Sequence, residues 1–208
     1  MRGPAIWTGR PGPGRPAGAD SVDTRRRVVE AACHCFARYG YGPATNTVIA
    51  ERAGVTAGSV YYHFGSKHNL FAAVCAHVYG RIADRLRRAV DGAHSVPDLL
   101  RAALVESDRI HRETPELTGF VASAPVDARR YPELAAAFAE QSGRLAAALA
   151  EAVAAGQAAG RIPADADPGA LAGLIGAVVD GFAHVATTSD PVLVERLTEL
   201  IERFVLPG

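Results

Sequence analysis

Cysteine is scarce in this sequence of 208 residues, which holds three cysteines and no Cys-x-x-Cys pair. An odd number without that spacing argues against a disulfide framework and against a structural zinc site. Cys33 and Cys35 lie two positions apart, about 200° around a helix, so they cannot share one metal ion. We expect both to be small buried residues, with a redox-sensing thiol as the alternative. The composition therefore favours a reducing cytoplasm and no metal.

Long hydrophobic runs are also missing. The longest uncharged apolar run, Pro168 to Val179, has 12 residues, whereas a transmembrane helix needs about 20. The N-terminus has no apolar segment of the kind found in secretory signals. We therefore expect a cytoplasmic protein with no membrane partner.

Aromatic residues make up only 7% of the chain, and the alternation of polar and apolar residues typical of strands is absent. Alanine, the best helix former, dominates the apolar residues. These features predict an all-α fold of about nine helices. The first 19 residues are rich in glycine and proline, which argues against ordered packing, so residues 1–21 are expected to form a flexible arm.

Capping residues and prolines predict where the helices begin and end. A helical pattern starts at Asp23, and Ser66 and Asp167 are placed to cap two later helices. Pro115, Pro125 and Pro132 are expected to confine one helix to about ten residues, because proline removes a helical hydrogen bond.

The net charge of +0 conceals an asymmetry between the two halves of the chain. Residues 1–90 carry a net charge of +8, and residues 91–208 carry −8. A basic half joined to an acidic half indicates a module that binds a polyanion, attached to a body of another kind. Chance clustering of surface charge is the alternative.

The segment 45–64 has the pattern of two short helices joined by a tight turn. Gly54 supplies the turn, because glycine adopts backbone conformations that other residues resist. The second helix presents short, hydroxyl-bearing and aromatic residues without any acid, and such a face can approach base edges in the major groove of DNA. A plain helical hairpin with a solvated face is the alternative.

The residues of this segment, IAERAGVTAGSVYYHFGSK from Ile49 to Lys67, resemble the DNA-binding signature of the TetR family of transcriptional regulators. The preceding AACHCFARYGY, from Ala31 to Tyr41, is similar to the first helix of that family. The resemblance implies a DNA-binding domain over residues 22–82, with its motif at 45–64. It implies an effector-binding and dimerisation domain over residues 83–208.

The resemblance also implies which residues contact DNA. Lys67 matches a phosphate-binding lysine, whereas Asn46 and Cys35 stand where the family often has an apolar residue and a leucine. The expected DNA-contacting set is Thr45, Asn46, Thr47, Thr56, Ala57, Gly58, Ser59, Tyr61, Tyr62, His63 and Lys67.

An effector cavity is expected among the helices of the second half, lined by apolar side chains with a few polar anchors. Two acid–histidine pairs share helix faces, Asp108 with His111 and Asp180 with His184, although both could be solvated pairs. The expected lining is Leu104, Asp108, His111, Phe120, Phe138, Leu145, Asp180, Phe182 and His184.

The last two predicted helices carry apolar stripes, and a second row of small residues leaves one of them apolar on two faces. Burial against another chain accounts for such a helix, with core packing within the chain as the alternative. TetR-like proteins use a C-terminal helix pair to dimerise. The expected interface is Leu171, Leu174, Ile175, Val178, Val179, Phe182, Leu193, Leu197, Leu200, Ile201 and Phe204.

The sequence thus predicts a homodimeric transcriptional regulator, a repressor that binds an inverted-repeat operator in double-stranded DNA and is released by an unidentified small molecule. No catalytic residues and no cofactor are expected. Two alternatives stay open: a DNA-binding regulator without an effector, and a helical ligand-binding protein or enzyme with a vestigial DNA-binding domain.

Overall fold

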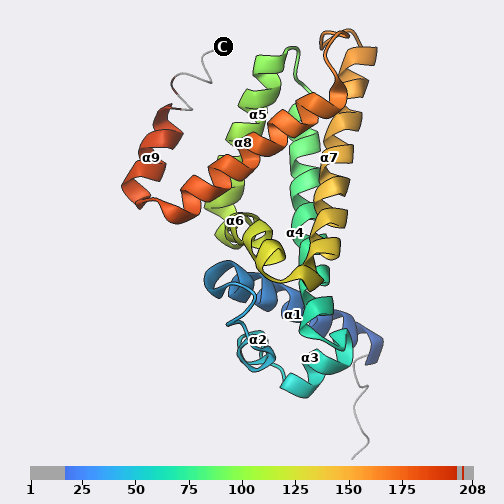
Figure 1. Cartoon of the computed structure of the whole chain (residues 1–208), viewed down its shortest axis with the longest axis vertical. Helices are drawn as coiled ribbons and strands as arrows, with labels where there is room; N and C mark the ends of the chain where they lie inside the picture. The colour runs from blue at the N-terminus through green and yellow to red at the C-terminus, as the bar shows by residue number, and fades with distance from the viewer. Residues whose placement is uncertain (1–16, 201–202, 204–208) are drawn as a thin grey trace, which may run out of the picture.

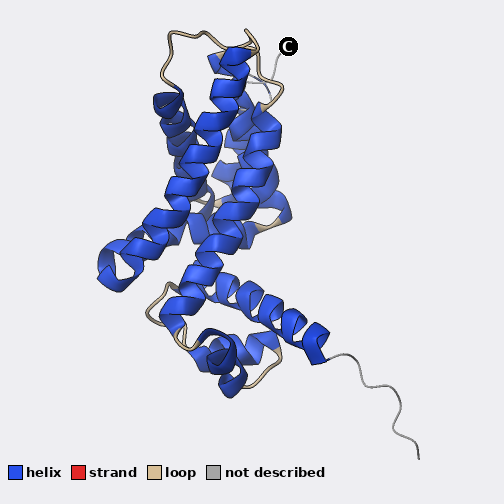
Figure 2. Cartoon of the chain, turned by 90° about the vertical axis from the view of Figure 1, so that its right-hand side faces the viewer, coloured by secondary structure: helices blue, strands red, loops and turns tan. Residues whose placement is uncertain are grey.

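The computed structural model describes residues 17–200 and Arg203, and over that range the chain is helical without strands, as the sequence predicts (Figure 2). A short 3-10 helix, Pro132–Leu134, precedes α7. The α-helices of the described residues are α1 (Ala17–Tyr39), α2 (Asn46–Ala53), α3 (Ala57–Phe64), α4 (Lys67–Val90), α5 (Val96–Glu113), α6 (Pro115–Arg130), α7 (Ala135–Ala158), α8 (Pro168–Thr188) and α9 (Pro191–Leu200).

The helices form two groups that share one long helix (Figure 1). Helices α1, α2 and α3 make the smaller group at one end of the molecule, and α4 leads from it into the larger group, where it runs alongside α7. Helix α6 packs on α1 at the junction of the groups, while α8 crosses α5, α6 and α7. Changes in the larger group can therefore reach the smaller one through α4 and α6.

The predicted caps are confirmed where side chains accept the free amides at helix starts. The Ser66 hydroxyl accepts the Asn69 amide at 3.1 Å, and the Asp167 carboxylate accepts the Ala170 amide at 2.6 Å. These bonds satisfy donors that the helix itself leaves free, and they fix the starts of α4 and α8.

Two predicted boundaries are wrong. Helix α1 begins at Ala17 rather than Asp23, so residues 17–21 of the predicted arm are helical, whereas residues 1–16 lie outside the described part. Helix α6 has 16 residues rather than about ten, because Pro125 sits inside it. The buried residues around that proline, including Val121 and Ala124, offset the single helical hydrogen bond that it removes.

A cluster of aromatic rings joins the two groups of helices. Phe36 of α1 lies 5.6 Å from Phe71 of α4, and Phe71 lies 5.5 Å from Phe120 of α6, measured between ring centroids. All three side chains are fully buried. Phe120 was expected to line an effector cavity, and it belongs instead to this junction, because it faces α1 and α4 rather than the middle of the larger group.

Candidate nucleic-acid interface and effector site

The segment 45–64 folds as the helix–turn–helix that its sequence predicts. The Thr45 hydroxyl accepts the Val48 amide at 3.3 Å, and the Thr56 hydroxyl accepts the Ser59 amide at 3.1 Å. Between them, Gly54 ends α2 in the left-handed conformation, with φ of +65°. Ile49 of α2 and Val60 of α3 are buried, so the turn and a small core hold the two helices at a fixed angle.

Helix α3 turns its uncharged face to the exterior. Ala57 and Gly58 are exposed at its start, and Tyr61 and Tyr62 are 67% and 83% exposed. A Cβ built on Gly58 would meet only the Thr56 hydroxyl, at 3.8 Å, so the space above this turn of the helix is open. The backbone of α3 could therefore approach the base edges in a major groove of DNA closely.

The remaining predicted contacts differ in their exposure. Thr45, Thr47 and Thr56 are exposed, whereas Asn46 is half-buried. Ser59 and His63 are half-buried as well. The contacts of these side chains with DNA stay predictions.

Lys67, the expected phosphate ligand, has partners within the chain. Its ammonium donates to the carbonyls of Tyr41 at 2.8 Å and Gly42 at 3.1 Å, and it lies 4.2 Å from the centre of the Tyr41 ring. Burial lowers the pKa of Lys67. A phosphate contact stays a prediction, and the structure adds an internal role in holding the segment that precedes α2.

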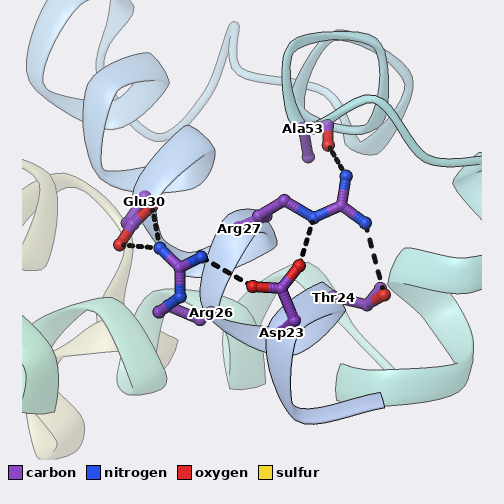
Figure 3. A network of polar contacts seen from close by, with 6 residues as sticks. All are labelled: Asp23, Thr24, Arg26, Arg27, Glu30 and Ala53. Atoms are coloured by element: carbon purple, nitrogen blue, oxygen red, sulfur yellow. Dashed lines mark hydrogen bonds and ion pairs between the residues drawn. The ribbon is translucent and has the colours of Figure 1, made fainter. Parts of the chain in front are cut away.

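Arg27 ties α1 to the end of α2, a role that the sequence analysis missed (Figure 3). Its guanidinium donates to the Ala53 carbonyl at 3.2 Å, close to the negative end of the α2 dipole. Asp23 orients this arginine through an ion pair of 3.2 Å and also pairs with Arg26 at 2.6 Å. The helix–turn–helix is thus fixed on α1 by a charged group as well as by its apolar core.

The three cysteines are buried thiols, as expected for Cys33 and Cys35, and burial raises the pKa of Cys33 and of Cys75 to about 12. Burial also raises the pKa of Cys35. Since the thiolate is the reactive form, we expect a thiol-directed disulfide reagent at pH 8 to label the native protein at least about 100-fold more slowly than the protein in guanidinium chloride. Fast labelling of one native thiol would restore the redox-sensing alternative.

A small, partly open cavity of about 10 Å³ lies between α4, α5, α6 and α8 of the larger group. Phe182 is the one predicted lining residue that borders it. The side chains around it are Ile82, Ser107, Ile110, Thr118, Val121, Val179, Phe182 and Ala183. The space suffices for about one water molecule, so in this conformation it is too small for an effector.

The other predicted lining residues do not border this cavity. Asp108 pairs with Arg112 one turn further along α5 at 2.8 Å, and the His111 ring packs against Phe182 at 6.2 Å. Phe138 of α7 packs against Tyr79, with ring centroids 5.9 Å apart. Leu104 and Leu145 are partly buried, whereas Asp180 and His184 are exposed. Helical spacing predicts which of these side chains share a face of one helix. It does not predict which neighbouring helix that face packs against.

The sequence analysis also missed an open hollow of about 340 Å³ where α1, α2, α4 and α6 meet. Arg27, Arg52 and Arg81 line it together with His34 and Glu116. These residues are scattered over 90 positions, so no local pattern marks them.

Helix α8 buries one face within the chain and leaves another uncovered. Ile175 and Val179 are buried against the larger group, which removes both from the expected dimer interface and assigns them to the core. Leu171, Val178 and Phe182 are half-buried. Leu174 is 44% exposed, and a Cβ on Gly173 or Gly181 would meet nothing within 4 Å.

Helix α9 follows α8 at the edge of the molecule (Figure 1). Leu193 and Leu200 are 47% and 49% exposed, and Leu197 is half-buried. Ile201 and Phe204, also expected at the interface, lie outside the described residues.

By length and composition alone α8 could cross a membrane, which the search for uncharged runs did not indicate. Its most apolar 18-residue window has a mean hydropathy of 1.6, and 22% of that window is buried. A single such helix is weak support for a membrane, because a helix that packs against other protein passes the same test.

Comparisons with known proteins agree with this geometry. Residues 28–74 match the family of bacterial regulatory proteins described as the tetR family, and residues 97–206 match the C-terminal domain of BetI-type transcriptional repressors. The chain is similar to an HTH-type transcriptional repressor of Mycobacterium tuberculosis, with 28% identity over 182 residues that cover 87% of this chain and 92% of the relative.

Solved structures share the fold. A TetR-family transcriptional regulator from Rhodococcus sp. aligns over 88% of this chain and 96% of its own, with a TM-score of 0.72 and 23% identity. The transcriptional regulator FadR from Bacillus subtilis, in complex with stearoyl-CoA, aligns over 85% of this chain and 96% of its own, with a TM-score of 0.63 and 17% identity.

Proposed function

Since the chain belongs to the TetR family of bacterial regulatory proteins and carries a BetI-type C-terminal domain, we propose that it binds an inverted-repeat operator as a homodimer and leaves it when a small molecule binds. The chain is a DNA-binding transcriptional repressor and not an enzyme. We place its action in the cytoplasm, where its operator is accessible.

The observation that carries the proposal is the exposed, acid-free face of α3 above a fixed turn. Gly58 leaves the helix backbone open, and the hydroxyls of Tyr61 and Tyr62 project from an exposed surface. Small residues permit close approach to base edges, and hydroxyls bind bases or phosphates. The net charge of +8 over residues 1–90 adds attraction for the DNA backbone.

The homodimer is supported by the uncovered apolar surface of α8 and α9. Leu174, Leu193 and Leu200 are each close to half exposed, and the glycines of α8 let a second helix approach closely. One recognition helix reads only a few base pairs, whereas a two-fold dimer reads an inverted repeat whose half-sites lie about 34–36 Å apart. The dimer therefore reads enough base pairs to recognise a specific operator.

The effector site is proposed at the cavity between α4, α5, α6 and α8. Its lining is mainly apolar, with the Ser107 and Thr118 hydroxyls as polar groups, which is the composition of small-molecule pockets. A ligand must enlarge this space, and the enlarged form would differ in the positions of α4 and α6, which reach the DNA-binding group. Release from DNA requires that the ligand bind this form more tightly than the DNA-bound form.

The test combines DNA selection with ligand titration. Purified protein is used to select binding sites from a random DNA pool, and an inverted repeat with half-sites one helical turn apart is expected. Titration of stearoyl-CoA, the ligand of the FadR neighbour, and then of smaller apolar and cationic compounds, is followed by gel shift on that site. Selection of an asymmetric single site would contradict the homodimeric operator.

Filling the cavity is expected to weaken the effector response without affecting DNA binding. Val121→Ile adds one methylene group beside the space of about 10 Å³. A buried methylene contributes about 0.8 kcal/mol to the closed form, so about fourfold more of any releasing compound should be needed. Val126→Ile, at an exposed position of α6, is the matched control. Equal release from both variants would place the effector elsewhere, and the hollow beside Arg52 and Arg81 would be tested next.

A further inference from the structure

The loop between α1 and α2, residues 40–45, leads directly into the DNA-binding motif. It begins at Gly40, whose φ of +76° reverses the chain after α1, and it ends at Thr45, the cap of α2. Tyr41 and Ala44 within it are buried. The position of this loop therefore sets where α2 starts, and with it the angle at which the motif meets DNA.

An acidic side chain of α6 holds this loop from across the domain junction. Asp127 is only 7% exposed, and its Oδ2 accepts the Tyr41 amide at 2.9 Å, although the two residues are 86 positions apart. A Cβ built on Gly40 would lie 3.5 Å from the other oxygen of Asp127, so the carboxylate sits directly against the loop backbone. A buried carboxylate accepting an amide makes a stronger hydrogen bond than a neutral pair does.

Tyr131, the residue directly after α6 and one turn beyond Asp127, fits against the next part of the loop. The Tyr131 ring lies 5.1 Å from the Tyr41 ring in an edge-on arrangement. A Cβ added to Gly42 would lie 2.2 Å from the Tyr131 hydroxyl oxygen, which leaves room only for glycine there while the ring stays in place. Asp127 and Tyr131 thus contact three consecutive loop residues.

The loop is held from the other side by α4. The Lys67 ammonium takes up the carbonyls of Tyr41 and Gly42, so Asp127 binds the amide of Tyr41 while Lys67 binds its carbonyl. The amide and the carbonyl of Tyr41 are therefore both hydrogen-bonded, one to a side chain of α6 and the other to a side chain of α4. Movement of α6 relative to α4 would break one of these contacts.

The opposite end of α6 borders the central cavity through Thr118 and Val121. Pro125 lies between that end and Asp127, and because proline has no amide hydrogen, the Val121 carbonyl lacks its partner four residues along the helix. The helix is therefore less constrained between its cavity end and its loop end than an uninterrupted helix would be.

We propose that Asp127 is a positioning residue for DNA recognition, which holds the α1–α2 loop, and hence α2 and α3, in the orientation that fits the operator. The inference rests on the proposed placement of α3 in the major groove. It assigns to α6 a direct contact with the start of the DNA-binding motif.

The test compares operator binding with binding to random DNA. Asp127→Ala leaves the Tyr41 amide buried without an acceptor, and operator affinity should fall about tenfold or more, while the affinity for random DNA at the same salt changes less than about twofold. Asp127→Asn keeps an acceptor oxygen but loses the charge, and an intermediate loss of about threefold is expected. Base contacts depend on the angle of both motifs, whereas phosphate contacts tolerate small rotations.

The matched control is Glu106→Gln, which makes the same chemical change at another buried carboxylate. Glu106 of α5 pairs with Arg85 and with Arg109 at 3.1 Å and lies in the larger group, away from the loop. The Glu106→Gln variant should keep the ratio of operator affinity to random-DNA affinity within about twofold of the parent value, even if its melting temperature falls. A loss of that ratio equal to that of Asp127→Ala would show a general effect of destabilisation and overturn the proposal.

Amide exchange gives a second measurement. In Asp127→Asn the Tyr41 amide and those of α2 should exchange faster than in the parent protein, whereas α7 should be unchanged. If Asp127→Ala does not fold, the Asn variant and this measurement decide the question. An Asn variant with parental exchange and parental operator affinity would refute the role of Asp127. A parent protein that selects no inverted repeat would instead refute the proposed function.

Discussion

Replacing Gly58 by glutamate should abolish operator binding while leaving the protein folded and dimeric. Gly58 is exposed on α3, and a side chain added there meets only the Thr56 hydroxyl, at 3.8 Å, so the free protein accommodates it. In the complex the same side chain would enter the space between helix and base edges and bring a negative charge towards the phosphates. On one preparation, gel shift measures operator binding, sedimentation measures dimerisation, and thermal melting measures folding.

The effect is large because a dimer carries two recognition helices. Loss of good base contacts costs roughly 1–3 kcal/mol at each half-site, and two half-sites give about 2–6 kcal/mol, or about a 30- to 20,000-fold loss of affinity. Gly143→Glu is the matched control, because Gly143 is an exposed helical glycine of α7 with nothing within 4 Å of an added Cβ. It should bind the operator as the parent does. A footprint retained by Gly58→Glu would show that α3 does not lie in the groove.

The double change Leu174→Glu with Leu193→Glu is expected to give a folded monomer. Phe182 is a poor choice for this purpose, because it packs on His111 and borders the internal cavity. Leu174 and Leu193 are 44% and 47% exposed on α8 and α9, so their loss should leave the core of one chain intact. Sedimentation and the helical circular dichroism of the same sample report assembly and folding.

Full burial of an exposed leucine contributes roughly 1.5–3 kcal/mol, and since Leu174 and Leu193 are 44% and 47% exposed, the four leucines of a two-fold interface would lose about 3–6 kcal/mol. The glutamates would in addition be buried without partners. The monomer should lose specific operator binding and retain weak binding that salt abolishes. Tyr39→Glu, at a half-exposed aromatic residue of α1, controls for added charge and should remain dimeric. A dimer that survives the double change would place the interface away from α8 and α9.

The helix–turn–helix could be predicted because its determinants are local. Thr45 and Thr56 cap helices within three residues of themselves, and Gly54 has the conformation that its sequence neighbours require. Such features depend on backbone geometry over a few positions, and the sequence displays them directly. For the same reason the starts of α4 and α8 were predicted at Ser66 and Asp167.

The sites in the larger group could not be predicted in the same way, because each depends on which helix faces which. Ile175 and Leu174 are adjacent in one apolar run, yet one is core and the other is exposed. Phe120 was expected to line the effector cavity and packs instead on α1 and α4. Asp127 carries no local signal at all, since its partner Tyr41 lies 86 residues away. Helical periodicity identifies an apolar face but not its neighbour.

The internal bonds of Lys67 have a chemical consequence, because it is the only lysine in the chain. The protein therefore offers acylating reagents a single side-chain amine, and that amine is hydrogen-bonded to the carbonyls of Tyr41 and Gly42. Its rate of acylation measures how often the Lys67 ammonium leaves these two carbonyls. Acylation would also remove the charge and the donors that hold this segment, so a modification that happens during an opening would keep the loop from closing again.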